Sequence, residues 1–162
     1  MEKIKEGDIK MKVTVAVCGA FDPYPHIGHL EHIRLAKQLG DELIVIMNSD
    51  ADVFRKRGAV FTPMGQRYRM LKDNKNVDEV YISIDGDGTI TKSLLWLKPQ
   101  ILAKGGDRVA STMPKSEIEM CEKIGCKIIY GIGEALDSST EILKRILDFQ
   151  GELFHRASGD FR

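Results

Sequence analysis

Among the residues of this chain, His26 and His29 are the pair whose type and spacing best suit catalysis or ligand binding. They flank Gly28, follow the apolar run 13–18 and a turn, and open a segment of helical periodicity. Residues three apart share a helix face, and the free N–H groups and dipole of a helix N-terminus attract anions. Gly28 leaves space for a phosphate to approach the backbone. The pattern therefore predicts a site that binds a triphosphate and stabilises charge at phosphorus.

Two other interpretations of these histidines remain open. They could be surface or capping residues at a helix start, or they could be metal ligands. No Cys/His cluster elsewhere in the sequence accompanies them, so we expect no metal site. The chain has three cysteines, Cys18, Cys121 and Cys126, without CxxC spacing. That arrangement is typical of small buried side chains in a reducing compartment.

Three more segments carry residues that could bind phosphate. The run Arg55–Gly58 is basic and ends in glycine, and cations can clamp phosphate oxygens. The segment Lys104–Arg108 combines two glycines, two cations and a carboxylate, so a ligand can pass close to its backbone. The segment Asp137–Glu141 opens a helical pattern with hydroxyls and free N–H groups. Each has a plainer interpretation as a solvated helix end, a turn and an N-cap, respectively.

The elements that must position these segments alternate along the chain. Apolar, β-branched runs occupy 12–18, 43–47, 80–84, 100–103 and 127–130, and helical patterns occupy about 27–39, 49–56, 64–73, 89–97, 114–124 and 139–149. Continuous apolar strands alternating with helices predict an α/β fold, a parallel sheet covered on both faces. Ligands of such sheets bind beyond the carboxyl ends of the strands. Every segment described above follows a predicted strand, so we expect them to meet there.

Bulk properties narrow the class of protein. The 162 residues suit one domain, which we place at 12–149 with a flexible tail at 1–11 and a C-terminal extension at 150–162. The 24 basic and 24 acidic residues leave no net field that would attract nucleic acid or an anionic membrane. No apolar run reaches membrane-spanning length, and the start of the sequence is polar rather than signal-like. We therefore expect a cytoplasmic protein.

Taken in order, these segments resemble the nucleotidyltransferase superfamily that carries the HIGH motif. The similarity covers about residues 12–147 and is greatest to the cytidylyltransferase-like enzymes, in particular the adenylyltransferase domain of bacterial ADP-heptose synthases of lipopolysaccharide core biosynthesis. Two departures from the pattern are an additional residue between Asp22 and His26, and Arg108 where that family often has Tyr. The matching segments are Phe21-Asp22, His26–His29, Asn48-Ser49-Asp50, Arg55–Gly58, Gln66-Arg67, Lys104–Asp107 and Ser138–Thr140.

The resemblance implies a fold and an activity. The fold is a single-domain Rossmann-like HIGH nucleotidyltransferase with a five-stranded parallel sheet. The activity is transfer of a nucleoside monophosphate to a phosphorylated small molecule, with release of pyrophosphate. We expect ATP rather than CTP, Mg²⁺ carried on the triphosphate, a sugar phosphate acceptor such as heptose 1-phosphate, and a possible homodimer. The open alternatives are a cytidylyltransferase acting on a glycerol 3-phosphate-like acceptor, an FAD synthase-type adenylyltransferase, and a non-catalytic nucleotide sensor.

The resemblance also assigns residue roles. His26, His29 and Lys104 are the expected catalytic residues, and backbone groups near 131–133 and Asp137 are expected to read the base. The expected nucleotide-binding residues are Gly19, Ala20, Phe21, Asp22, His26, Gly28, His29, Lys104, Gly105, Asp107, Ser138, Ser139 and Thr140. Candidates for the acceptor and its phosphate are Asn48, Asp50, Arg55, Arg57, Arg67 and Arg108.

Overall fold

The computed structural model describes residues 11–106 and 108–159, with side chains as far as residue 151. Its centre is one parallel sheet with strand order β3-β2-β1-β4-β5. The strands are β1 (Thr14–Gly19), β2 (Glu42–Met47), β3 (Glu79–Ile82), β4 (Ile101–Ala103) and β5 (Lys127–Ile129). The predicted five-stranded parallel sheet is confirmed, and each strand lies within two residues of its predicted bounds.

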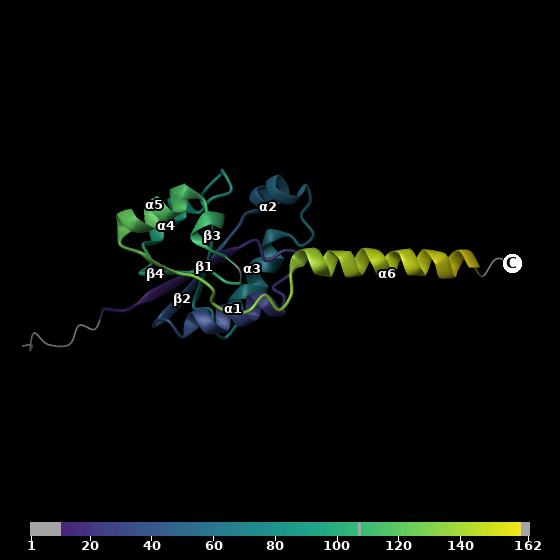
Figure 1. Ribbon diagram of the computed structural model, residues 1–162, viewed down its shortest axis with the longest axis horizontal. Coiled ribbons are helices and arrows are strands. Elements are labelled where there is room, and N and C mark those ends of the chain that lie inside the picture. The colour runs from purple at the N-terminus through teal and green to yellow at the C-terminus, as the bar shows by residue number, and fades with distance from the viewer. Residues whose placement is uncertain (1–10, 107, 160–162) are drawn as a thin grey trace, which may run out of the picture.

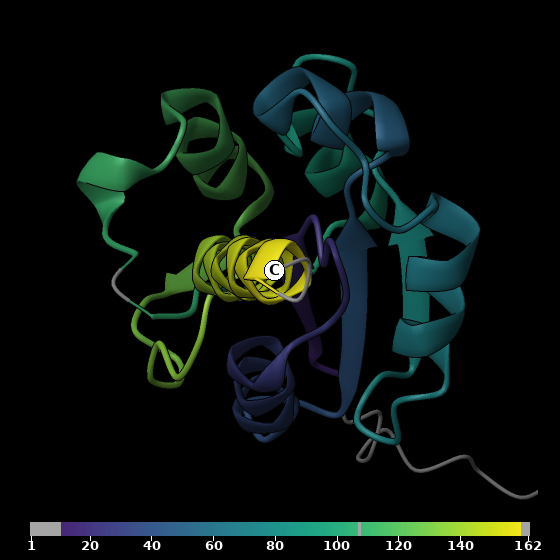
Figure 2. The same cartoon turned by 90° about the vertical axis from the view of Figure 1, so that its right-hand side faces the viewer.

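Helices cover both faces of the sheet (Figures 1 and 2). On one face, α1 and α3 bury Ile33, Ala36 and Leu71 against β1 and β2. On the other face, α4 and α5 bury Leu94 and Cys121 against the same central strands and β4. The helices are α1 (Ile27–Lys37), α2 (Asp50–Arg57), α3 (Met64–Lys72), α4 (Thr91–Leu97), α5 (Lys115–Ile124) and α6 (Ser139–Gly159), with a short 3-10 turn η1 (Ala110–Thr112).

The last helix is longer than the sequence pattern predicted. We expected it to end near residue 149, whereas α6 continues without a break to Gly159 and projects away from the sheet (Figure 1). Its buried base includes Ile142, and the following apolar side chains Ile146, Leu147 and Phe149 are exposed. Within 11–106 and 108–159, no helix is both long and apolar enough to cross a membrane.

The point where the chain reverses its direction across the sheet lies between β1 and β4. Val15 pairs with Leu43 of β2 on one side and with Ile101 of β4 on the other. The loops that leave β1 and β4 therefore diverge over opposite faces of the sheet and open a crevice at the carboxyl ends of these strands. Crevices of this kind are where open α/β sheets bind ligands.

Candidate active site

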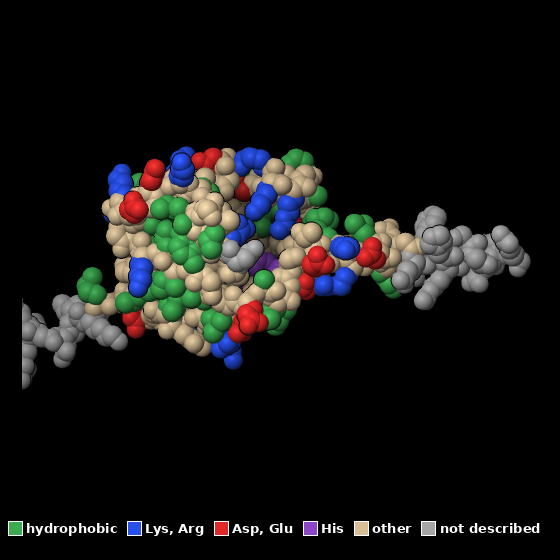
Figure 3. Space-filling model, viewed as in Figure 1, with side chains coloured by type: hydrophobic (Ala, Val, Ile, Leu, Met, Phe, Trp, Pro, Cys, Tyr) green, Lys and Arg blue, Asp and Glu red, His purple; other side chains and the backbone are tan. Residues whose placement is uncertain are grey.

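A cavity of about 570 Å³ occupies the crevice between β1 and β4. It lies among the starts of α1 and α6 and the loops that follow β1, β4 and β5, and Figure 3 shows histidine in the hollow with Lys and Arg along one side. Its size is typical of small-molecule sites. The predicted residues that line it are Gly19, Ala20, Phe21, His26, Gly28, His29, Asn48, Arg57, Lys104, Gly105, Arg108, Ser138, Ser139 and Thr140.

His26 and His29 form a pair at the start of α1, as their spacing predicted. Their ring centroids are 3.8 Å apart, and the ring of Phe21 packs against His29 at 4.8 Å. The backbone N–H of His26 donates to Nδ1 of His29 over 3.4 Å. A neutral imidazole that accepts at Nδ1 carries its proton on Nε2. His29 therefore presents an N–H donor at its other ring nitrogen.

Both imidazoles are neutral at pH 7. Burial, together with the charges of His26, His32 and Arg57, lowers the pKa of His29 to about 3. Burial also lowers the pKa of His26, with Arg57 adding to the effect and the carboxylate of Asp137 opposing it. The two side chains are therefore suited to donating hydrogen bonds to an anion without first taking up a proton.

The start of α6 is held against the start of α1 at Gly28. A Cβ added to Gly28 would lie 3.0 Å from the backbone oxygen of Asp137 and 3.2 Å from the ring of His26. Arg145 of α6 fixes Asp137 through a 2.7 Å ion pair. His26 is buried, and its Nδ1 has no hydrogen-bond partner among the described residues. Two helix N-termini and an unpaired imidazole nitrogen thus meet at one place, which suits phosphate binding.

Lys104, which follows β4, is a partly buried cation that lines the same cavity as the histidines. Its Nζ donates to Cys18 Sγ at 3.1 Å and to Glu117 Oε2 at 3.3 Å. Burial lowers the pKa of Lys104, but Cys18 and Glu117 outweigh that effect and raise it above its ordinary value. Lys104 is therefore charged at pH 7 and can stabilise negative charge in the cavity.

Further cations line one side of the cavity. Lys56 and Arg57 come from the end of α2, and Arg108 from the loop after β4. Burial lowers the pKa of Lys56, and the nearby charges of Arg108 and Arg57 lower it further. Arg57 also donates to the carbonyl oxygen of Asp22 at 2.7 Å. Three converging cations suit a second anionic group next to the one held by the histidines.

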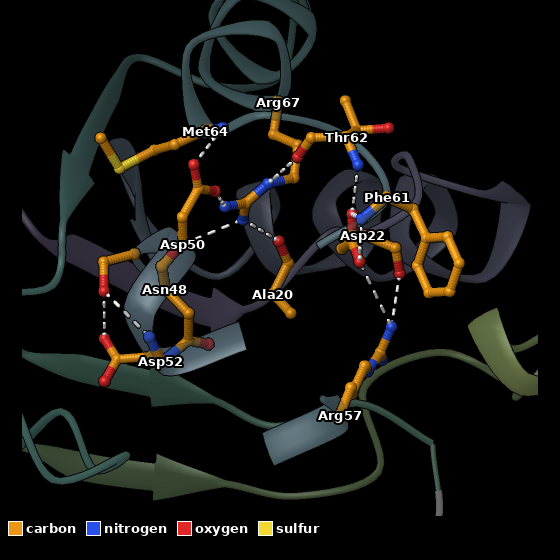
Figure 4. Close-up of polar contacts among 11 residues, drawn as sticks. Ala20, Asp22, Asn48, Asp50, Asp52, Arg57, Phe61, Thr62, Met64 and Arg67 are labelled. Atoms are coloured by element: carbon orange, nitrogen blue, oxygen red, sulfur yellow. Dashed lines mark hydrogen bonds and ion pairs between the residues drawn. The ribbon is translucent and has the colours of Figure 1, made fainter. Parts of the chain in front are cut away.

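Arg67, predicted to bind the acceptor, has a structural role instead (Figure 4). Its side chain is fully buried, and it donates to the carbonyl oxygens of Ala20 at 2.5 Å, Asn48 at 3.0 Å and Thr62 at 2.9 Å. A 2.6 Å ion pair joins it to Asp50. Arg67 and Asp50 therefore tie the loops after β1 and β2 to α3, and neither lines the cavity.

Asp22 and Arg55 also lie away from the cavity lining. Asp22 is buried, and a cis peptide bond joins it to Pro23. Its carboxylate accepts hydrogen bonds from the N–H groups of Phe61 and Thr62. Arg55 pairs with Asp52 of its own helix at 2.8 Å. Another predicted nucleotide-binding residue, Asp107, lies outside the described residues.

Sequence reasoning missed several residues that line the cavity. Lys56 lies inside the basic run that was recognised, but only its two neighbours were assigned a role. His32 continues the three-residue spacing of His26 and His29 along α1, which was an available signal. Glu117 comes from α5, and nothing in its local sequence indicates that it reaches Lys104.

Comparisons with known proteins agree with this geometry. A sequence model of the cytidylyltransferase-like family matches residues 16–145. An FAD synthase from Pyrococcus abyssi is 32% identical over 143 residues, 85% of this chain and 94% of that protein. The bifunctional protein HldE from Hahella chejuensis is 35% identical over 138 residues, 79% of this chain but 26% of that protein.

A solved structure shares the fold. The lipopolysaccharide core biosynthesis protein from Thermoplasma volcanium superposes with a TM-score of 0.62 and 27% identity, covering 76% of this chain and 98% of that one. The crevice at the β1–β4 reversal, the paired imidazoles at the start of α1 and the match over 16–145 agree with one another. The chain belongs to the cytidylyltransferase-like family and is a nucleotidyltransferase.

Proposed function

We propose that the chain transfers AMP from ATP to a phosphate monoester and releases pyrophosphate. The observation that carries this proposal is the meeting of two neutral imidazoles, His26 and His29, with the N-termini of α1 and α6 in a cavity that the charged Lys104 also lines. ATP enters as its Mg²⁺ complex, and the metal ion is part of the substrate. Similarity to proteins named FAD synthase supports ATP over CTP.

The reaction needs positioning and charge stabilisation rather than a general base. A phosphate monoester is largely dianionic at pH 7. One of its oxygens forms a bond to the α-phosphorus while the bond from that phosphorus to the bridging oxygen of the β-phosphate breaks. The electron pair leaves with pyrophosphate. Nε2–H of His29 and the ammonium of Lys104 would stabilise the charge that develops on the α-phosphate, and the hydroxyls of Ser139 and Thr140 would hold the leaving phosphates.

FMN is the acceptor that the cationic side of the cavity fits best. Ile90, Met113 and Pro114 line the same cavity as Lys56 and Arg108. The N–H of Ile90 donates to Glu117 at 3.2 Å, and Glu117 also pairs with Lys104. A planar aromatic ring with a phosphate needs both an apolar wall and cations. FAD is FMN joined to AMP, and the FAD synthase relatives match nearly along their full length.

Heptose 1-phosphate is the second candidate acceptor. The order of the motifs resembles ADP-heptose synthases, and the similarity to HldE and to the Thermoplasma volcanium protein of lipopolysaccharide core biosynthesis supports a polar acceptor. The deciding assay measures pyrophosphate release with Mg²⁺, with ATP or CTP, and with FMN, heptose 1-phosphate or glycerol 3-phosphate. We expect pyrophosphate release with ATP and FMN and with no other combination. Binding of ATP without release in any combination would instead favour a nucleotide sensor.

The proposal includes a homodimer formed through α6. A groove lined mostly by apolar side chains lies beside the turn that precedes α1, and the start of α6 packs against the start of α1 at Gly28. The helix projects from the domain (Figure 1), so two copies facing each other would bring the distal part of each α6 towards the groove of the other. Light scattering should show a dimer that Leu147→Glu and Phe149→Glu dissociate and Asp148→Asn leaves intact. The groove residues are Pro23, Tyr24, Pro25, Leu30, Thr62 and Met70.

A further inference from the structure

A third imidazole, His32, lies one helical turn beyond His29 and is surrounded by two loops. Its Nδ1 is 2.7 Å from the carbonyl oxygen of Ile132, in the loop after β5. A carbonyl oxygen only accepts, so Nδ1 must carry a hydrogen. Burial lowers the pKa of His32, which keeps the ring neutral at pH 7 with that single proton. His32 thus ties α1 to a segment 100 residues away.

The two loops around His32 are joined to each other. The N–H of Ile132 donates to Lys104 O at 2.9 Å, and the N–H of Gly106 donates to Gly133 O at 3.2 Å. A Cβ at Gly105 would lie 2.9 Å from the His32 ring and 3.2 Å from the Ile132 oxygen. The imidazole therefore fills the space between the loops and leaves no room for a methyl group at position 105.

These two loops line part of the cavity. They contribute Gly105, Gly106, Glu134 and Ala135 to its lining, mostly backbone and small side chains. Such a surface offers N–H and C=O groups to the edge of a base, and discrimination between bases then depends on where those groups stand. A partly buried donor that fixes one of the carbonyl groups is consequently able to control base recognition.

We propose that His32 is a positioning residue that determines which base the enzyme accepts, by holding the 131–136 loop through Ile132. This inference rests on the proposed function, because it takes the cavity to bind a nucleoside triphosphate. The imidazole acts through the loop and contacts no phosphate. His32 therefore differs from His26 and His29, whose removal affects the chemical step.

Three substitutions of His32 separate this role from simple packing. His32→Asn keeps an N–H donor at the position of Nδ1, His32→Gln moves it to the position of Nε2, and His32→Leu removes it. Calorimetry with ATP, CTP and inorganic tripolyphosphate measures each variant, with thermal unfolding as a check on folding. Tripolyphosphate has no base, so its affinity reports the phosphate site alone.

The expected result is specific to the donor. His32→Asn should bind ATP within about twofold of wild type, and His32→Gln and His32→Leu about tenfold more weakly, the value of one lost hydrogen bond. The preference for ATP over CTP should fall in the same two variants, with tripolyphosphate affinity unchanged. In turnover assays the loss should fall on KM for ATP rather than on kcat.

Two outcomes would overturn the inference. One is a wild-type preference for ATP in His32→Leu, and the other is an equal loss of ATP, CTP and tripolyphosphate binding in all three variants. The proposed function fails differently, since it fails when wild-type protein binds ATP but releases no pyrophosphate with any acceptor. In that case calorimetry alone still decides the role of His32.

Discussion

Replacing Arg67 with leucine should unfold much of the loop structure beneath the cavity. The guanidinium satisfies three backbone carbonyl oxygens and pairs with Asp50, and no part of the side chain reaches solvent. Leucine fills part of the volume but leaves those acceptors without donors. If Arg67 instead bound an acceptor phosphate, the variant would fold normally and lose activity only.

The size of the effect follows from the number of partners. Because Asp50 is partly exposed, the cost comes mainly from the three carbonyl oxygens, and leaving them without a donor should cost about 3–5 kcal/mol in all. In a chain of this length, that loss lowers Tm by about 10–15 °C. Arg67→Lys retains the charge without the planar fork of donors and should lose about half as much.

Urea unfolding followed by circular dichroism measures the loss directly. Arg69→Leu is the matched control, because it removes an exposed arginine from the same helix and should change the free energy of unfolding by less than about 0.5 kcal/mol. An Arg67→Leu protein with the stability of this control and a loss of pyrophosphate release would refute the structural role.

Other substitutions at the helix start test the site itself. Gly28→Ala pushes a methyl towards the Asp137 oxygen and should lower pyrophosphate release on the order of 10²-fold, whereas Gly65→Ala, with open space around it, should leave release unchanged. His29→Ala should lower kcat about 10²–10³-fold while ATP still binds by calorimetry. In the folded protein the pKa of His29 is lowered, mainly by burial, from 6.5 to about 3. As the pH falls below 6.5, the imidazole of His29 is therefore protonated in the unfolded chain but not in the folded one. Above pH 6.5 neither state is protonated there, so native stability should fall by about 2 kcal/mol between pH 6.5 and 5; urea unfolding should show a smaller fall for His29→Asn.

The sheet could be predicted because its evidence is local. The run Leu43–Met47 is continuously apolar, as a strand covered on both faces must be, and helical spacing separates it from the next run. The start of α1 could be predicted equally well, since its two imidazoles and Gly28 lie within four residues. The length of α6 could not be predicted, because the polar composition of 150–159 resembles that of an exposed tail as closely as that of an exposed helix.

The roles of charged residues depend on distant backbone. Arg67 and Arg57 are the same residue type, and their local sequences do not tell their roles apart. Arg67 is buried and donates to carbonyl groups 19 and 47 residues earlier in the chain, whereas Arg57 lines the cavity. His32 lies on the inner side of α1, and its partner is 100 residues away. Residue type indicates that a charge or donor is present, whereas only the fold decides whether its partner is a ligand or the chain.

The central position of β1 has a consequence for synthesis of the chain. β1 and β2 can pair early, but the other edge of β1 must wait for β4, because Val15 pairs with Ile101 across 86 residues. Until that pairing forms, the edge of β1 is open to wrong partners. The nucleotide crevice spans this same seam, so a nucleotide that binds only the completed seam also stabilises the folded enzyme. The cellular supply of the substrate would then help to set how much folded enzyme persists.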